Sequence, residues 1–209
     1  MALVIPPPGV ELPGTFGDID IYLFDQLLRG RFDPRPRVLD AGCGSGRNLV
    51  YFLRRGFVCF GVDRDPAAIE QVQALAAQLA PQLPAENFRT GELDRLPWAD
   101  ATMDAVVCSA VLHFARDLGH FDRMLAELWR VLAPGGMLFA RLASNIGLEH
   151  AVGAAGSRVR LPDGSDRFIV DEAMLLERTG RLGGALLDPL KTTNVQQQRC
   201  MTTWVLSKP

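Results

Sequence analysis

Three glycines at alternate positions, Gly42, Gly44 and Gly46, follow a short apolar run that ends in Asp40. The run at residues 37–40 is typical of a buried strand, and the residues after the glycines are typical of a helix. Glycine permits a turn with positive φ and lets a ligand approach the main chain closely. The new helix offers unpaired N–H groups to an anionic group, with a dipole contribution of roughly 0.3–1 kcal/mol. This pattern predicts a ligand-binding loop.

Asp63 stands at the end of the next apolar run, about twenty residues further along the chain. A carboxylate at a strand end can accept hydrogen bonds from both vicinal hydroxyls of a ribose, each worth about 1.5–3 kcal/mol. An acidic residue at this position also serves NAD sites, so it does not distinguish the ligand classes alone. Together with the glycine loop, it predicts a ligand that contains a nucleoside.

Two classes of ligand use such a loop. A dinucleotide site requires GxGxxG, with the third Gly or Ala packing the helix on the strand. In this sequence Arg47 occupies that third position, and the last glycine comes one residue early. The spacing GxGxG after an acidic residue instead resembles motif I of the class I S-adenosylmethionine-dependent methyltransferases.

Two further segments carry the same resemblance. Residues 90–109, TGELDRLPWADATMDAVVCS, are similar to the family pattern GDxxxLPFxDxxFDxVVxS, with Glu92 in place of the more frequent Asp. Residues 109–114 and 132–138 are similar to its SxxLHH and LKPGGxL segments. The resemblance covers roughly residues 37–142. Within the methyltransferase type 11 proteins, Gly46-Arg47-Asn48 and the Ser-x-Val-Leu segment resemble the tellurite-resistance-type branch.

The resemblance implies an enzyme that transfers a methyl group from S-adenosylmethionine and leaves S-adenosylhomocysteine. It implies that Asp63 binds the ribose, that Glu92 meets the adenine amino group and that the main chain of Leu93 holds the ring. It also places Arg47 on the cofactor carboxylate and Ser109, with the residues up to His113, beside the methionine portion. The implied cofactor residues are Asp40, Gly42, Cys43, Gly44, Gly46, Arg47, Asn48, Asp63, Arg64, Glu92, Leu93 and Ser109.

The methyl acceptor is not identified by the sequence, and a small molecule is expected. His113 is a candidate general base because an unperturbed histidine has a pKa near ~6.5, although the interpretation that it only shapes the pocket is favoured. Tyr22, His150 and Arg160 are candidate acceptor contacts. His150 and Arg160 fall in a segment whose Pro-Asp-Gly-Ser sequence at residues 162–165 predicts a hairpin above the carboxyl edge of the sheet.

Strand and helix signals alternate along the chain, which predicts an α/β fold with both faces of a parallel sheet covered. We expect a Rossmann-like, doubly wound, mostly parallel seven-stranded sheet with a C-terminal antiparallel strand pair. Residues 134–136, Pro-Gly-Gly, are expected to form a turn between a helix and a strand. The predicted single domain consists of an extended arm (1–16), an N-terminal helix (17–30), a cofactor-binding core (36–142), a substrate-side insertion (143–170), and a helix with the last two strands (171–209).

Composition restricts the partners. Lys and Arg number 22 and Asp and Glu 24, which gives a formal net charge of -2, so we expect no nucleic-acid partner. The N-terminus lacks a basic region, and no stretch approaches the ~20 apolar residues of a membrane span, so neither a signal peptide nor a membrane partner is expected. The four cysteines form no CxxC pair, which indicates reduced thiols in a cytoplasmic protein and no metal site.

Two other functions fit parts of the pattern. The chain could bind S-adenosylmethionine as a non-catalytic partner subunit, since the cofactor motif says nothing about an acceptor site. It could also be an NAD-dependent oxidoreductase, which Arg47 at the third glycine position opposes. The oligomeric state is left open by the sequence.

Overall fold

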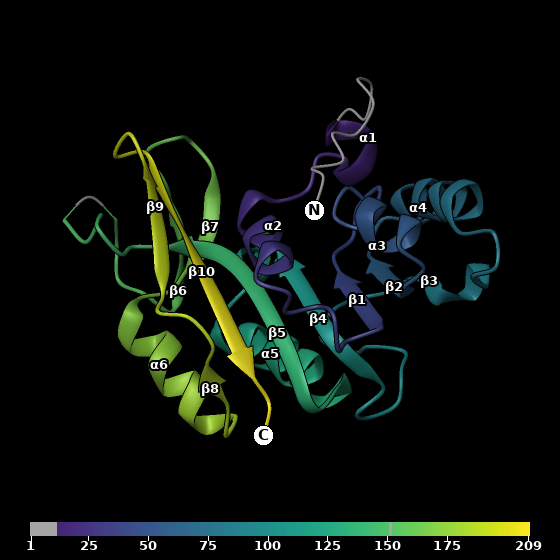
Figure 1. Cartoon of the computed structure of the whole chain (residues 1–209). Coiled ribbons are helices and arrows are strands. Elements are labelled where there is room, and N and C mark those ends of the chain that lie inside the picture. Colours follow the sequence, from purple (N-terminus) through teal and green to yellow (C-terminus); the bar gives the residue numbers. More distant parts are fainter. Residues whose placement is uncertain (1–11, 151) are drawn as a thin grey trace, which may run out of the picture.

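The computed structural model describes residues 12–150 and 152–209 (Figure 1). Its strands are β1 (Arg37–Ala41), β2 (Val58–Asp63), β3 (Phe88–Thr90), β4 (Met103–Ser109), β5 (Leu132–Ser144), β6 (Ser157–Arg160), β7 (Asp166–Ile169), β8 (Ala185–Leu186), β9 (Lys191–Val195) and β10 (Arg199–Ser207). Its helices are α1 (Leu12–Phe16), α2 (Ile21–Leu28), α3 (Val50–Arg54), α4 (Pro66–Leu79), α5 (Leu118–Val131) and α6 (Glu172–Arg181), with 3-10 turns η1 (Ala85–Asn87) and η2 (Leu112–Phe114). The part of the extended-arm prediction that covers residues 1–11 lies outside the described residues.

The main sheet has the strand order β3-β2-β1-β4-β5-β10-β8, with β9 also paired to β10. The five strands from β3 to β5 run parallel, and β10 runs antiparallel to β5. One edge of β10 pairs with β5. The other edge is therefore shared by β8 and β9, which pair with different parts of β10. The predicted parallel sheet with an antiparallel end is confirmed, and its seventh position is filled by two short strands instead of one.

Neighbouring residues of the central strands face opposite layers of helices. Val38 of β1 packs in a buried cluster with side chains from α2, α3 and α4, whereas Leu39 packs with side chains from α5 and α6. In β5, Leu138 packs in the same cluster as Leu39, and Phe139 packs in the same cluster as Val38. A parallel sheet requires this covering on both faces, which explains why its strands are apolar at successive positions.

Residues 12–16 form the helix α1, so the prediction of an extended segment is wrong there. Pro13 lies in the first helical turn, where the missing N–H group of proline costs nothing. Gly17 has a φ of +62° and donates its N–H to the carbonyl of Pro13 at 2.7 Å, which is a common way to end a helix. The ring of Phe16 stacks on Tyr51 of α3 with 5.2 Å between centroids, so α1 packs on the domain.

The expected turn at residues 134–136 is instead a bulge inside β5. The ladder with β4 pairs Leu132 with Met103 and then resumes at Met137 opposite Ala105. The N–H of Gly135 donates to the carbonyl of Lys208 at 2.9 Å. Lys208, which follows β10, therefore pairs with backbone groups of the bulge that the ladder with β4 leaves unpaired.

The hairpin of β6 and β7 forms around residues 162–165, where the sequence predicts it. Phe168 of β7 is fully buried, and its ring stacks on Phe121 of α5 with 5.1 Å between centroids. Ser144 at the end of β5 forms a parallel bridge with Val170 after the hairpin. The hairpin is thus fixed to the carboxyl end of the sheet. Among the described helices, none is both long and apolar enough to cross a membrane.

Candidate functional site

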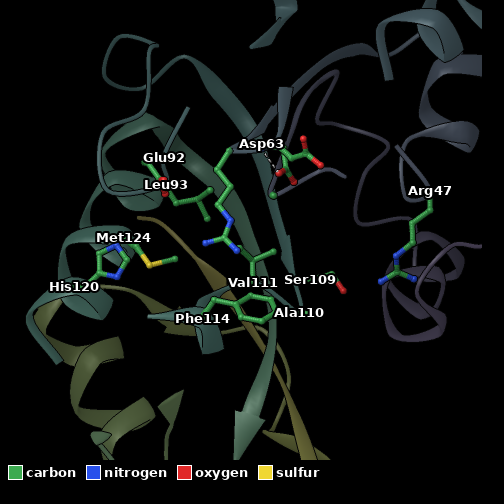
Figure 2. A pocket seen from close by; sticks show the side chains of 13 residues that line it. Arg47, Asp63, Glu92, Leu93, Ser109, Ala110, Val111, Phe114, His120 and Met124 are labelled. Atoms are coloured by element: carbon green, nitrogen blue, oxygen red, sulfur yellow. Dashed lines mark hydrogen bonds between the residues drawn. The ribbon is translucent and has the colours of Figure 1, made fainter. Parts of the chain in front are cut away.

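A cavity of about 460 Å³ opens at the carboxyl ends of β1, β2 and β4, where open α/β sheets bind ligands. We call it the first cavity. Asp63 lies on one side of it and Phe114 on the other, with His120 and Met124 at one end and Arg47 at the opposite end (Figure 2). The complete lining consists of Gly42, Arg47, Asp63, Arg64, Asp65, Glu92, Leu93, Ser109, Ala110, Val111, Phe114, His120 and Met124.

The glycine loop forms one wall of the first cavity because its backbone is held against neighbouring elements. Gly42 has a φ of +80°, and a Cβ atom there would lie 2.4 Å from Val111 Cγ2. The N–H groups of Gly42 and Cys43 both donate to the carbonyl of Val62, at 2.7 and 3.0 Å. A Cβ atom on Gly46 would lie 2.7 Å from Val72 of α4. Glycine is therefore required at positions 42 and 46 by both conformation and space.

Asp63 joins the glycine loop to the start of α4. Its Oδ2 accepts the N–H of Gly44 at 2.9 Å, and its Oδ1 accepts the N–H of Asp65 at 3.0 Å. An ionised carboxylate can accept about four hydrogen bonds. Each oxygen of Asp63 therefore keeps capacity for one more donor, which suits a pair of ligand hydroxyls.

Asp40 is buried at the end of β1, with 1% of its surface exposed. Burial raises the pKa of its carboxyl from 3.8 to about 7, a shift that the nearby Arg47 opposes and Asp63 reinforces. Its Oδ2 atom is buried and has no hydrogen-bond partner among the described residues. A buried acceptor of this kind attracts a proton or a donor group of a ligand.

Seven of the predicted cofactor residues line the first cavity: Gly42, Arg47, Asp63, Arg64, Glu92, Leu93 and Ser109. The other five, Asp40, Cys43, Gly44, Gly46 and Asn48, do not line it, and their cofactor contacts stay predictions. Besides Gly46, whose packing against Val72 is described above, three of these five residues have local structural roles. Gly44 donates to Asp63, the Cys43 side chain packs against Gly61, and the Asn48 side chain accepts the N–H of Asp20 at 3.0 Å.

Asp20 is a site residue that sequence reasoning missed. It caps α2 by accepting the N–H of Tyr22, and its Oδ2 accepts the hydroxyl of Ser109 at 2.9 Å and Nη1 of Arg141 at 3.3 Å. Nη2 of Arg47 lies 4.0 Å from the same oxygen. The N-terminal helix is thereby fixed to the cavity wall by one buried carboxylate. A capping Asp before a helix is common, so the sequence could show the cap but not the long-range contacts.

A second cavity, of about 310 Å³, lies next to the first and shares Ala110 and Phe114 with it. Its walls come from η2, the end of β5, the turn of the β6–β7 hairpin, and the ends of β9 and β10 that meet at their turn. The complete lining consists of Ala110, His113, Phe114, Arg141, Ala143, Leu161, Asp163, Ser165, Arg167, Val195, Arg199 and Met201. In Figure 1, β7 and the turn between β9 and β10 lie at the same end of the molecule.

His113 lines the second cavity and is buried, with 5% of its surface exposed. Burial lowers the pKa of its imidazole from 6.5 to about 3, and the charges of Arg167 and Arg141 lower it further in the same direction. Its Nδ1 accepts the N–H of Ala143 at 3.3 Å, which assigns the ring proton to Nε2. His113 is therefore a neutral hydrogen-bond donor, and a weak base at neutral pH.

Comparison with known proteins assigns the core of the chain to a family. Residues 39–140 match the model of a family described as a methyltransferase domain. This segment is a methyltransferase domain. Its boundaries agree closely with residues 37–142, the range over which the sequence resembles such enzymes.

Curated relatives match this chain over more residues than the methyltransferase domain itself contains. The chain is 33% identical over 126 residues to the uncharacterized methyltransferase YodH of Bacillus subtilis, covering 60% of this chain and 48% of that protein. It is 30% identical over 139 residues to the malonyl-(acyl-carrier protein) O-methyltransferase of Erwinia billingiae, covering 66% and 51%. The chain thus spans about half the length of the curated relatives it matches.

Similar folds are also known from crystal structures. Magnesium protoporphyrin IX methyltransferase of Synechocystis PCC 6803, solved with bound SAH, superimposes with a TM-score of 0.66 at 18% identity. The match covers 91% of this chain and 81% of that one. The fold of the methyltransferase domain and of the elements around it is therefore shared.

Four lining residues of the first cavity were not predicted: Asp65, Phe114, His120 and Met124. Ala110 has a φ of +63°, which is uncommon for a residue other than glycine. It directly follows β4 and donates its N–H to the carbonyl of Arg141 at 2.7 Å. Its position beside Ser109 was the available signal, but no sequence rule predicts a left-handed alanine. His120 and Met124 belong to α5, one of the helices that cover the sheet.

The three predicted acceptor contacts Tyr22, His150 and Arg160 line neither the first nor the second cavity. Tyr22 packs under the guanidinium of Arg141, 5.0 Å from ring centroid to Cζ, and its hydroxyl contacts Thr193. His150 is exposed and lines neither cavity. Arg160 is also exposed and pairs with Asp166 at 2.9 Å across the hairpin.

Proposed function

We propose that this methyltransferase domain binds S-adenosylmethionine in the first cavity and catalyses transfer of its methyl group to a small-molecule acceptor. The observation that carries the proposal is the position of Asp63. Its carboxylate stands at the end of β2, opposite the glycine bend, with acceptor capacity left on both oxygens. The match to a methyltransferase family over residues 39–140 supports the choice of cofactor.

The residues present fit the cofactor in three ways. The glycine loop brings backbone to the cavity wall at Gly42, where a side chain would collide with Val111. Asp63 and Glu92 supply carboxylates for hydroxyl and amino donors, and both line the cavity. When it is ionised, the buried carboxylate of Asp40 beside the loop would favour a cationic group of the ligand. A volume of about 460 Å³ also lies within the usual range for small-molecule sites.

When bound, the sulfonium supplies both the methyl group and its leaving group. The task of the protein is then to hold the acceptor in line with it, and such orientation can contribute ~7–11 kcal/mol to lowering a barrier. Ala110 and Phe114 lie where the two cavities meet and are the residues that would position the acceptor. His113 is held neutral by burial. This supports a role in shaping the pocket and donating a hydrogen bond into it, and it does not favour general-base catalysis.

Calorimetry with S-adenosylhomocysteine and with NAD tests the proposal. We expect S-adenosylhomocysteine to bind and Asp63→Asn to weaken it by about 10–100-fold, because hydrogen bonds to a charged group are worth about 1.5–3 kcal/mol. Glu70→Ala, which removes an exposed carboxylate of α4 outside both cavities, is the matched control and should bind normally.

Binding of NAD without any response to S-adenosylhomocysteine would contradict the proposal and favour an oxidoreductase. A non-catalytic partner subunit is separated by a different measurement. Formation of S-adenosylhomocysteine from S-adenosylmethionine in a panel of small acceptors is expected of the enzyme, and binding without any turnover is expected of the subunit.

A further inference from the structure

We propose that the second cavity is the acceptor site and that it binds its acceptor through a carboxylate group. This inference rests on the proposed function, because it names the class of molecule that the methyltransferase domain would methylate. It is carried by the charge of the lining, by the unused donors of its arginines and by the shared wall with the first cavity.

The second cavity is positively charged in a protein of net charge -2. Arg141, Arg167 and Arg199 line it, and among its lining residues Asp163 is the one acidic side chain. With His113 neutral, the lining carries a net charge of +2, or +1 when Asp20, the buried partner of Arg141, is included. An anion is attracted to such a site, and a cationic acceptor is repelled.

Asp163 forms one long ion pair with these arginines, to Arg199. Its Oδ1 accepts both the N–H and the hydroxyl of Ser165, at 2.9 and 2.6 Å, so it is held by its own turn. Its Oδ2 lies 3.6 Å from Nη1 of Arg199, beyond ordinary hydrogen-bond length. The guanidinium of Arg199 can therefore turn to a ligand without losing a strong partner.

The other two arginines are held in place and keep unused N–H groups. Arg167 lies over the ring of Phe114, 4.9 Å from its centroid, and donates one N–H to the carbonyl of Asp166. Arg141 donates to Asp20 through Nη1, and its side chain keeps 20% of its surface exposed. A guanidinium has five N–H donors in a planar fork that matches the two oxygens of a carboxylate.

The rest of the lining selects the body of the acceptor. Leu161, Val195 and Met201 present apolar surface, and Phe114 presents a ring on the side shared with the first cavity. A cavity of about 310 Å³ is at the small end of the range for ligand sites. The geometry thus favours a small molecule with an apolar body and one carboxylate.

The experiment uses the full chain saturated with S-adenosylhomocysteine and three pairs of probes: acetate and acetamide, succinate and succinamide, benzoate and benzamide. Each pair keeps its size and changes its charge, and all titrations are made at one ionic strength. We expect at least one carboxylate to bind tenfold or more tightly than its amide. Arg167→Gln should abolish that preference, and Arg160→Gln, which alters an exposed arginine of the same hairpin outside the cavity, should preserve it.

The inference is overturned if no carboxylate binds more tightly than its amide, or if Arg160→Gln weakens binding as much as Arg167→Gln. Binding of S-adenosylhomocysteine is measured first on every protein and reports folding. Arg199→Gln replaces Arg167→Gln if the latter does not fold. Failure of the wild type to bind S-adenosylhomocysteine would overturn the proposed function, whereas normal binding of it without a carboxylate preference would overturn this inference alone.

Discussion

At the scale of single residues, Gly42 makes the clearest link between backbone conformation and the first cavity. In Gly42→Ala a left-handed φ would cost about 1–2 kcal/mol, and the contact with Val111 would add about 1–3 kcal/mol of overpacking. We therefore expect the free energy of unfolding, measured by urea denaturation, to fall by roughly 2–5 kcal/mol. Binding of S-adenosylhomocysteine should weaken as well, since the loop must shift.

Gly135→Ala is the matched control for this variant. Gly135 has a φ of +76°, but a Cβ atom there would meet nothing within 4 Å. It should lose only the conformational part, about 1–2 kcal/mol, and bind S-adenosylhomocysteine normally. Equal losses in the two variants would show that the contact with Val111 is unimportant.

Asp40 makes stability depend on pH. Burial holds its folded pKa at about 7, whereas the unfolded value is 3.8. Between these values the unfolded chain releases a proton that the folded protein keeps, so this group destabilises the fold as pH rises. Asp40→Asn removes the titration. The stability of this variant relative to wild type should rise between pH 4 and pH 8, by at most roughly 4 kcal/mol. A difference that stays constant with pH would contradict this.

The residues that sequence could identify are those fixed by the ends of strands. Asp63 and Ser109 end apolar runs, and the carboxyl ends of parallel strands meet at one edge. Glu92 follows no apolar run and was identified by its place in the family pattern. The face of the hairpin could not be read in the same way. Residues directly opposite each other share a face, so Arg167 lies with Val159, while Arg160 lies with Asp166 on the other face. Arginine occurs on both faces, so its presence alone does not indicate which one meets the cavity.

At the scale of elements, the position of α2 depends on Asp20. Asp20→Ala would remove the helix cap and leave Ser109 and Arg141 without their acceptor, so we expect a loss of about 3 kcal/mol in the free energy of unfolding. Asp117→Ala removes only the cap of α5 and should cost about 1 kcal/mol. Denaturant titration of both variants measures the difference. Similar losses would show that the cap alone matters.

The order of elements was predictable because periodicity and breakers act locally, and the helices and strands of residues 37–131 follow it. Three features depended on distant partners. The bulge in β5 uses the carbonyl of Lys208, and the seventh strand position is divided between β8 and β9 along β10. The helix α1 packs Phe16 on a ring of α3. Local signals carry no information about such partners, so these features were missed.

At the scale of the whole molecule, a ligand bound only by the folded state should stabilise it. S-adenosylhomocysteine at 100 times its Kd would add about 2.7 kcal/mol, which for a chain of this size raises Tm by roughly 5–10 °C. NAD at the same concentration should leave Tm unchanged. Thermal unfolding followed by circular dichroism checks this, and a rise with NAD alone would contradict the cofactor assignment.

The left-handed backbone of Ala110 has a consequence for how the protein can change over time. This residue lines both cavities, so its side chain forms part of the wall that they share. A β-branched or bulky residue is strongly disfavoured at a φ of +63°, and glycine is the replacement that relieves the twist. The substitutions that the fold tolerates at this position are therefore biased toward a smaller side chain, and the conformation of the main chain itself keeps bulky groups out of the shared wall.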